Sequence, residues 1–317
     1  MNEELLNIVY VDTSDFACTG GVVDTCNNRE RTISYATFVK IPDEPIVPGL
    51  QYKECCYETL VLADDSGKLH KNDFSGFYYS RQIGSETCTY VLIDKQDGSE
   101  YPISDDTYGI FKSFGAISEQ PNLSTFIVQW NKILSALGEG AYQIRKDISI
   151  TGITYSELSS VFTLRTFSDF YADKTIRIDI KMDGFMELQN VDFTGTNYKS
   201  SLRVGGFFGR REPKYEEDNL VFRTKKIEQI SMKMVNAYKL QTELLPECVT
   251  EQIFDFYLFA DEIFLNDYNL NNHSYSYKNK AVDYENNEGT KYYTENRKAR
   301  LNLLFKDRYA NRNKINY

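Results

Sequence analysis

Residues 175–182 read Thr-Ile-Arg-Ile-Asp-Ile-Lys-Met, in which apolar and polar side chains alternate without interruption. Successive side chains of a strand point to opposite faces of a sheet, so this period of two predicts a strand. Asp183-Gly184 follows, a dipeptide that favours the type I′ turn of a hairpin, and residues 185–191 are predicted to return as the second strand. The stretch therefore indicates an antiparallel β-sheet.

Similar patterns recur along most of the chain. Strands are predicted at residues 5–11, 33–40, 58–63, 76–83, 88–94, 101–103, 142–150, 161–167 and 227–240. The segments at 88–94 and 101–103 flank Asp97-Gly98 and are predicted to form a hairpin with a loop longer than two residues.

A helix is predicted over residues 122–137. Its apolar residues, which include Trp130, recur with a period of 3.6. The opposite face, which includes Gln129 and Ser135, carries a single charge. A solvated helix face usually carries more, so we expect another chain to cover this one and take Gln129 and Ser135 as candidate interface residues.

A second helix is predicted from Pro246 to about Asp267. Glu247, Glu251 and Asp255 lie at i, i+4 and i+8 along its polar edge, where like charges repel. Such an edge indicates either a cationic partner or a solvated acidic face, and the three residues are further interface candidates.

The C-terminal residues are basic in an otherwise acidic chain. Residues 291–317 contain eight Lys or Arg and two Asp or Glu, a net charge of +6. Because the whole chain carries −10, residues 1–290 carry −16. Leu301, Leu304, Phe305 and Tyr309 have helical spacing between the cations. We expect an extended arm that becomes ordered when it docks, and whose removal leaves a folded subunit. Its candidate interface residues are Arg297, Arg300, Leu301, Phe305, Arg308 and Arg312.

The pattern as a whole predicts an α+β protein that is β-rich, mostly antiparallel and sandwich-like, with two principal helices. We divide it into an N-terminal β-rich module (1–105), a domain with both helices (106–290) and the C-terminal arm (291–317), with the break in the loop at 104–121.

Few residues have the spacing of a catalytic or cofactor site. His70 and His273 are the two histidines, and no cysteine pair has metal-ligand spacing. Residues 205–211, Gly-Gly-Phe-Phe-Gly-Arg-Arg, lack the Gly-Lys-Ser/Thr ending of a phosphate loop and indicate a glycine-rich bend in a strand. Residues 267–278 imitate a calcium loop but end in Lys278 instead of glutamate. We expect no enzyme activity, no cofactor and no metal.

Two pairs of carboxylates remain as an alternative. Asp64-Asp65 and Asp105-Asp106 have the residue type that glycoside hydrolysis needs, although aspartate is also a common turn residue.

The sequence also predicts the compartment in which the chain is made. The acidic start, Met-Asn-Glu-Glu, lacks the basic region of a signal peptide, and no apolar run reaches the length of a membrane span. We expect synthesis in a cytoplasm with the six cysteines reduced, and no membrane partner. The net charge argues against a protein that coats nucleic acid, with the C-terminal arm as the possible exception.

Three stretches resemble virion proteins of crAss-like and related tailed phages of gut Bacteroidota. They are residues 108–111 (Tyr-Gly-Ile-Phe), 126–132 (Phe-Ile-Val-Gln-Trp-Asn-Lys) and 138–142 (Gly-Glu-Gly-Ala-Tyr). The resemblance covers about residues 100–290 and contains no catalytic motif, so it assigns no functional residue. It implies a homo-oligomeric structural component such as a ring, collar, neck or tail subunit, with other tail, neck or portal proteins as partners. The location would be the virion, and the host cytoplasm during assembly.

Two other functions stay open from the sequence. One is a glycan- or receptor-binding module of a phage tail that uses exposed tyrosines, and the other is a glycan hydrolase. An oligomer of fixed stoichiometry would indicate the structural subunit, saturable glycan affinity the binding module, and turnover of a glycan the hydrolase.

Overall fold

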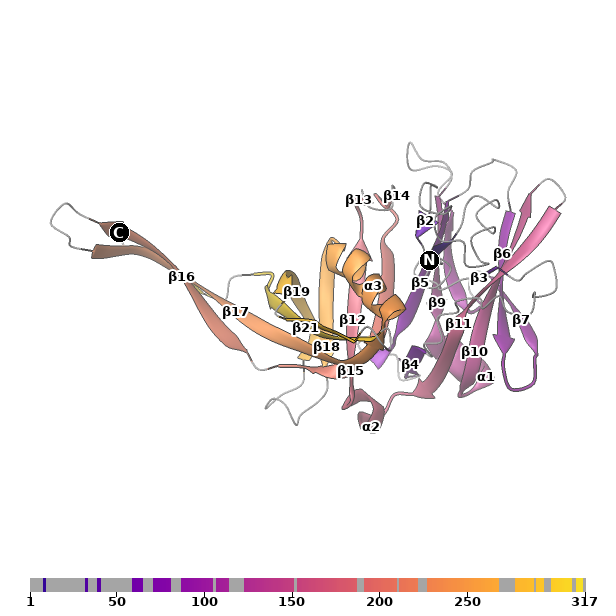
Figure 1. Cartoon of the computed structure of the whole chain (residues 1–317). Helices are drawn as coiled ribbons and strands as arrows, with labels where there is room; N and C mark the ends of the chain where they lie inside the picture. The colour runs from indigo at the N-terminus through magenta and orange to yellow at the C-terminus, as the bar shows by residue number, and fades with distance from the viewer. Residues whose placement is uncertain are drawn as a thin grey trace. The chain divides into compact units, whose positions relative to one another are not determined.

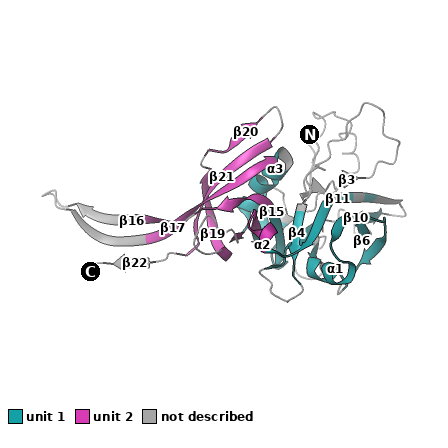
Figure 2. Ribbon diagram, turned by 90° about the horizontal axis from the view of Figure 1, so that it is seen from below, with its two compact units in different colours: residues 1–168, 179–203, 246–261 teal, residues 169–178, 204–245, 262–317 magenta. Residues whose placement is uncertain are grey.

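The chain folds into two units that are both built mainly from strands (Figure 1). The computed structural model describes residues 8–9, 32–33, 39–40, 59–64, 71–80, 87–104, 107–113, 123–150, 153–186, 191–209, 211–221, 227–267, 277–287, 289–293, 298–309 and 312–315. Unit 1 comprises residues 1–168, 179–203 and 246–261, and unit 2 comprises residues 169–178, 204–245 and 262–317 (Figure 2). Both sides of the predicted break at 104–121 thus belong to unit 1.

Unit 1 contains two principal sheets. The larger has the order β3-β11-β10-β6-β7, with β4 added parallel to β11, and the smaller has the order β5-β9-β8. Their bounds are β3 (Val39–Lys40), β4 (Thr59–Ala63), β5 (Phe74–Ser80), β6 (Thr87–Asp94), β7 (Glu100–Ile103), β8 (Gly109–Ser113), β9 (Leu123–Gln129), β10 (Gly140–Ile150) and β11 (Ile153–Thr166). Shorter elements are β1 (Ile8–Val9), β2 (Thr32–Ile33), β13 (Phe185–Met186), β14 (Val191–Asp192), α1 (Trp130–Leu137), α3 (Glu247–Asp255) and η6 (Tyr257–Phe259).

The core of unit 1 lies between these two sheets. Phe77 and Phe126, from the smaller sheet, stack with ring centroids 5.6 Å apart, and Phe126 lies 4.8 Å from Tyr90 of the larger sheet. Trp130, at the start of α1, packs 5.1 Å from Phe162, and its indole N–H donates to Ser75 Oγ at 3.0 Å. These aromatic side chains are all buried, so the predicted sandwich-like, mostly antiparallel architecture is confirmed.

Unit 2 contains most of a sheet that closes on itself. Its six barrel strands pair in the order β12-β15-β17-β21-β19-β18 and back to β12. The bounds are β12 (Thr175–Met182), β15 (Tyr198–Phe208), β17 (Ile227–Pro246), β18 (Glu262–Asp267), β19 (Tyr277–Asn287) and β21 (Lys298–Asp307). Also present are β16 (Glu212–Val221), β20 (Lys291–Tyr293), β22 (Arg312–Ile315) and the short helix α2 (Asp169–Ala172). β12 and β15 each begin in one unit and end in the other.

Aromatic rings fill the part of the barrel that belongs to unit 2. Phe208 stacks on Tyr238 with centroids 4.8 Å apart and meets Tyr277 edge-on at 5.1 Å. Phe305 of β21 completes this buried group. Asp267 is also fully buried, and its Oδ2 accepts the Phe208 N–H at 2.6 Å.

Gly206 lies where β15 and β17 approach each other very closely. This residue has φ of +151°, and a Cβ atom built on it would lie 2.3 Å from the Gln241 carbonyl oxygen on β17. Only glycine lets β15 and β17 approach this closely, so residues 205–209 form the predicted glycine-rich bend of a strand.

The predicted helix at 122–137 is wrong in its first half. Residues 123–129 form β9, which pairs with β5 and β8, and only residues 130–137 are helical. Thr125, Ile127 and Val128 are β-branched and favour a strand, while a short apolar run fits either period. The second predicted helix is likewise shorter: α3 ends at Asp255, and residues 262–267 form β18.

The strand at 175–182 is confirmed, but the hairpin predicted after it is wrong. β12 has β15 and β18 as neighbours, whereas β13 pairs with β14. Residues 176–180 are buried without exception, so β12 is an interior strand with both edges and both faces covered. Its edges are therefore taken by distant segments instead of the next one along the chain.

The predicted C-terminal arm is wrong as well. Leu301, Leu303 and Phe305 are fully buried side chains of β21, which pairs with β17, β19 and β20. The apolar residues that suggested a helical stripe also fit an alternating strand. Burial of alternate side chains inside the barrel stabilises the strand.

This placement reverses the expected effect of C-terminal truncation. Ending the chain at residue 295 removes β21 and opens the barrel, so we expect unit 2 to lose its cooperative unfolding transition in calorimetry. Ending it at residue 309 removes only β22 among the described strands and should preserve that transition. A chain of 295 residues with wild-type unfolding would contradict the barrel.

The bend at Gly206 gives a second prediction. Gly206→Ala adds a steric clash with β17 to backbone strain and should destabilise unit 2 by about 2–5 kcal/mol in urea unfolding. Gly98→Ala is the matched control, because Gly98 also has positive φ, +77°, but has open space where the Cβ would be. It should cost about 1–2 kcal/mol. Equal losses would show that the close approach of β15 and β17 is unimportant.

Candidate functional site

The two candidates from the first predicted helix do not share a helix face. Gln129 is the last residue of β9, and its backbone N–H donates to the Tyr108 carbonyl at 2.8 Å. Its side-chain Oε1 is buried and has no hydrogen-bond partner among the described residues. Ser135 is exposed on α1, and its hydroxyl donates to the Asn131 carbonyl at 2.9 Å. Only Ser135 therefore remains a surface candidate.

The acidic edge of α3 is partly engaged within the chain. Glu251 is half-buried, and Asp255 is exposed, although partial burial of the Asp255 carboxyl raises its pKa above the ordinary value. Both make polar contacts within the chain. Glu247 begins the helix, and its side chain lies outside the described part.

The C-terminal candidates separate into buried and exposed groups. Leu301 and Phe305 belong to the core of unit 2, so they are structural. Arg308 forms an ion pair with Asp283, with Nε 3.0 Å from Oδ1. Arg300 is exposed on β21, Arg312 begins β22, and Arg297 lies outside the described residues.

Arg300 belongs to a basic face on two neighbouring strands. In the ladder of β20 and β21, Lys291 is directly opposite Arg300, and Tyr293 is directly opposite Lys298. Directly opposed residues share one face of a sheet, and all four side chains are exposed. We call this set, Lys291, Tyr293, Lys298 and Arg300, the basic face.

A second surface is a β-ribbon that extends from the barrel. β16 and β17 pair antiparallel over ten positions, from Glu212 with Ala237 to Val221 with Ile227. β15 pairs with β17 only at residues 240–242, so these ten positions lie beyond that ladder. They correspond to a length of about 30 Å. We call residues 212–221 and 227–237 the ribbon; Figure 1 shows β16 and β17 projecting beyond the neighbouring strands β15, β19 and β21.

At the base of the ribbon, the described side chains of β16 are solvent-accessible, whereas Val235, Asn236 and Ala237 on β17 are buried. Residues 211–215 are all exposed, and Tyr215 retains 55% of its accessible surface. Lys214 Nζ lies 2.9 Å from Glu285 Oε2 and so ties the base of the ribbon to β19. Further along, β22 pairs with residues 231–234 of β17.

The sequence indicated these surfaces only in part. It predicted a strand at 227–240 but not its partner β16, because the alternation in residues 212–221 is polar on both faces. It marked the cations of residues 291–300 but not their common face. The short Thr-Glu-Asn-Arg stretch between Lys-Tyr-Tyr and Lys-Ala-Arg is a turn signal that could have indicated the hairpin.

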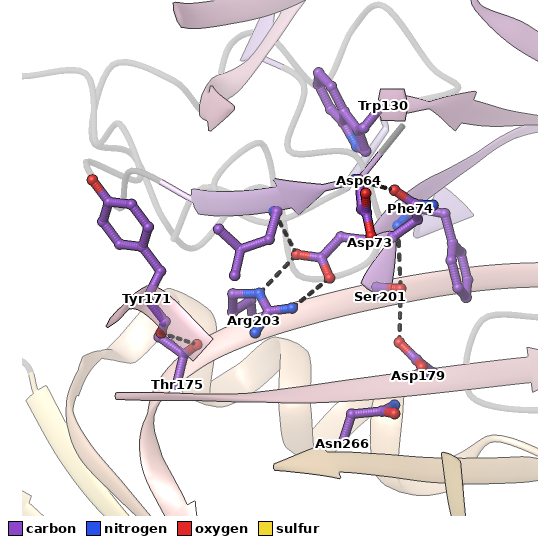
Figure 3. A network of polar contacts seen from close by, with 12 residues as sticks. Asp64, Asp73, Phe74, Trp130, Tyr171, Thr175, Asp179, Ser201, Arg203 and Asn266 are labelled. Carbon is purple, nitrogen blue, oxygen red and sulfur yellow. Dashed lines mark hydrogen bonds and ion pairs between the residues drawn. The ribbon is translucent and has the colours of Figure 1, made fainter. Parts of the chain in front are cut away.

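Unit 1 contains a buried polar network that is structural in character (Figure 3). Arg203 donates twice to Asp73, from Nε at 2.7 Å and from Nη2 at 2.6 Å, and both side chains are buried. Asp73 also accepts the Leu62 N–H at 2.8 Å. Nearby, Ser201 donates to Asp179 at 2.8 Å and accepts the Phe74 N–H at 3.3 Å. The network connects the start of β5 to β15 through Asp73 and Arg203, which are buried, and through Ser201, which is partly buried.

Glycine allows β5 and β15 to come close together. A Cβ atom on Gly76 would lie 2.1 Å from the Lys199 carbonyl oxygen, and Tyr198 donates its hydroxyl to the Gly76 carbonyl at 2.8 Å. Tyr257 OH contacts Ser200 Oγ at 3.2 Å, and burial raises the pKa of Tyr257. These groups maintain packing, and none of them opens to solvent.

The carboxylates proposed for hydrolysis are not gathered into a site among the described residues. Asp64 lies 3.4 Å from Lys71, while Asp65, Asp105 and Asp106 fall outside the described ranges, as do both histidines. On β10, Arg145 binds Glu100 in a bidentate pair and also Asp147, and the hydrogen bond to Glu100 raises the pKa of the guanidinium. This cluster links strands on the outer face of the sheet.

The described ranges contain neither a cluster of metal ligands nor a membrane-spanning helix. No group of three His, Cys, Asp or Glu in the described ranges could hold a metal ion. None of the helices seen there is long and apolar enough to cross a membrane. Neither a family model nor a curated protein sequence matches this chain.

The buried pair of Asp73 and Arg203 is testable by a double-mutant cycle. Arg203→Met leaves a buried carboxylate without its cation and should cost about 3–5 kcal/mol in urea unfolding. Adding Asp73→Asn removes the charge but keeps an oxygen for the Leu62 N–H, so it should recover at least about 1 kcal/mol. Strictly additive effects would show that the two side chains do not stabilise each other.

Proposed function

We propose that this chain is a structural subunit of a tailed-bacteriophage virion, where it forms an oligomeric ring, neck or tail component through subunit interfaces. The ribbon is the observation that carries the assembly role, and the sequence resemblance to virion proteins supplies the phage context. In this proposal the chain acts in the virion, with copies of itself and other tail, neck or portal proteins as partners, and has no catalytic turnover.

The physics of short sheets supports the use of the ribbon as an arm. A two-stranded ribbon is marginally stable in water by itself and gains stability when another surface packs against it. β22 adds a third strand at residues 231–234. Tyr215, half-exposed between charged neighbours, is the residue type that is enriched at protein interfaces. An arm about 30 Å long, anchored in a closed barrel, is suited to reach a neighbouring subunit.

The exposed tyrosines support a second candidate function, a glycan- or receptor-binding module. Tyr292, Tyr293 and Tyr309 all keep more than two fifths of their surface accessible. Exposed aromatic rings are suited to stack on sugars, and this function predicts saturable glycan binding by the isolated protein with no need for assembly.

Shortening the ribbon tests the proposed function. Glu216 and Lys233 are direct partners, so residues 217–232 can be replaced by an Asn-Gly turn that closes the hairpin at this pair. We expect the wild-type chain to form an oligomer of fixed stoichiometry in native mass spectrometry and the shortened chain to remain a folded monomer. Circular dichroism checks the fold.

The control for this experiment removes residues 312–317 alone, since β22 pairs with the replaced part of β17. If the shortened chain forms the wild-type oligomer, the ribbon is not an assembly arm. If the wild-type chain is monomeric with and without candidate tail proteins and binds a glycan, the module is the better description.

A further inference from the structure

The basic face carries three cations that the described part of the chain does not neutralise. Lys291, Lys298 and Arg300 are exposed side chains on the neighbouring strands β20 and β21 (Figure 2), and among the described residues none of the three forms an ion pair. Lys291 and Arg300 are direct cross-strand partners, and like charges in that position repel. A bound anion would relieve this repulsion, so the arrangement favours an anionic ligand.

The acidic side chains on the adjoining strands are engaged elsewhere. Asp283 and Glu285 of β19 each form an ion pair with a cation that does not belong to the basic face. Glu243 of β17 is exposed, but its Oε2 would lie 2.5 Å from a Cβ atom built on Gly205, so this carboxylate lies toward β15. The sequences of β20 and of residues 298–306 contain no Asp or Glu. The three cations are therefore available to a ligand from outside the chain.

An exposed aromatic ring lies among these cations. Tyr293 retains 43% of its accessible surface, is directly opposite Lys298, and lies two residues from Lys291 on the same face of β20. Side chains two residues apart on a strand are about 7 Å apart, and directly opposed ones are about 5 Å apart. Surfaces that bind single-stranded nucleic acid combine the same two groups, cations for the phosphates and aromatic rings on which bases stack.

We propose that the basic face binds single-stranded nucleic acid, with its three cations on phosphates and Tyr293 stacked on a base. This goes beyond the proposed function, because it adds a ligand to the subunit and does not depend on the ribbon. Residues 1–290 carry a net charge of −16, which repels phosphate from the rest of the molecule. The contact is therefore restricted to this face and to a short stretch of the strand.

A single strand matches the basic face better than a duplex or an acidic peptide. Each nucleotide carries one phosphate and one base, so any register along the strand supplies both groups that the face can bind. A duplex keeps its bases stacked on one another, which leaves Tyr293 without a role, and duplex-binding proteins commonly make about 6–10 phosphate contacts. An acidic peptide supplies charge at each residue but no planar ring.

The charge contribution is tested by salt dependence. Fluorescence anisotropy of the full-length protein with a labelled strand of about ten thymidylates measures the affinity, and an oligouridylate of equal length should bind similarly. Three phosphate contacts give a slope of about −2 for log K against log salt. Lys298→Gln with Arg300→Gln should reduce the slope to about −0.7 and weaken binding at low salt at least about tenfold.

The matched control for charge is Lys95→Gln with Lys199→Gln. Both lysines are exposed in unit 1, and the change in net charge equals that of the variant of the basic face. The affinity and the slope should stay at their wild-type values.

The stacking contribution is tested separately. Tyr293→Ala should weaken binding at least about fivefold and leave the salt slope unchanged. On a strand of equal length that lacks bases, Tyr293→Ala and the wild-type protein should bind equally. Tyr292→Ala is the control, because Tyr292 is the preceding residue of β20 and is exposed, but points to the opposite face. Circular dichroism of each variant checks that it is folded.

Three outcomes would overturn the proposed contact. The first is a wild-type protein that does not bind the strand at low salt. The second is a duplex or an inorganic polyphosphate that binds as tightly as the strand, with no effect of Tyr293→Ala, which would identify a general anion surface. The third is a variant at Lys298 and Arg300 that loses its oligomeric state in native mass spectrometry but keeps its affinity for the strand, which would identify a contact between subunits. The ribbon is intact in all these variants, so failure here leaves the proposed function standing.

Discussion

The closure of β17 on β21 is the constraint on which most of unit 2 depends. The Leu301 N–H donates to Thr242 Oγ1 at 3.0 Å where these two strands meet, and the ladder completes a barrel whose interior is filled by Phe208, Tyr238 and Phe305. Closure removes the two edges that an open sheet would expose. It also fixes the start of the ribbon, because β17 belongs to both, and it places Lys298 and Arg300 on the outside by fixing which face of β21 is buried.

Unit 1 combines an apolar core with a buried polar contact between strands. Its sandwich core is apolar and aromatic, but β5 meets β15 through a polar contact built on Asp73, Arg203 and the small residue Gly76. An ion pair enclosed by protein gives up hydration, and hydrogen bonds of good geometry offset that cost. The Leu62 N–H, which Asp73 also accepts, makes the carboxylate a junction between strands and fixes their register.

The sequence predicted most of the strands and the β-rich class, because alternation is a local property. It could not distinguish a helix from a strand at residues 123–129 or at residues 263–265, because a short apolar run fits both periods. Strand partners were the main failure. Residues 183–184 look like a hairpin turn, yet β12 pairs with segments far along the chain, because pairing depends on which surfaces become buried. The candidate surfaces show the same difference between local and long-range information. The sequence shows the cations of residues 291–300, but only the pairing of β20 with β21 shows that they share one face.

One strand, β17, runs without interruption from the barrel into the ribbon, and this has a mechanical consequence. A pull on the far end of the ribbon acts along the strand axis. Inside the barrel, the hydrogen bonds of β17 to β15 and β21 lie across that axis, so they would share the load together instead of opening one after another. The arm is thus anchored in the arrangement that best resists being drawn out, which is a useful property for any assembly that must bear tension.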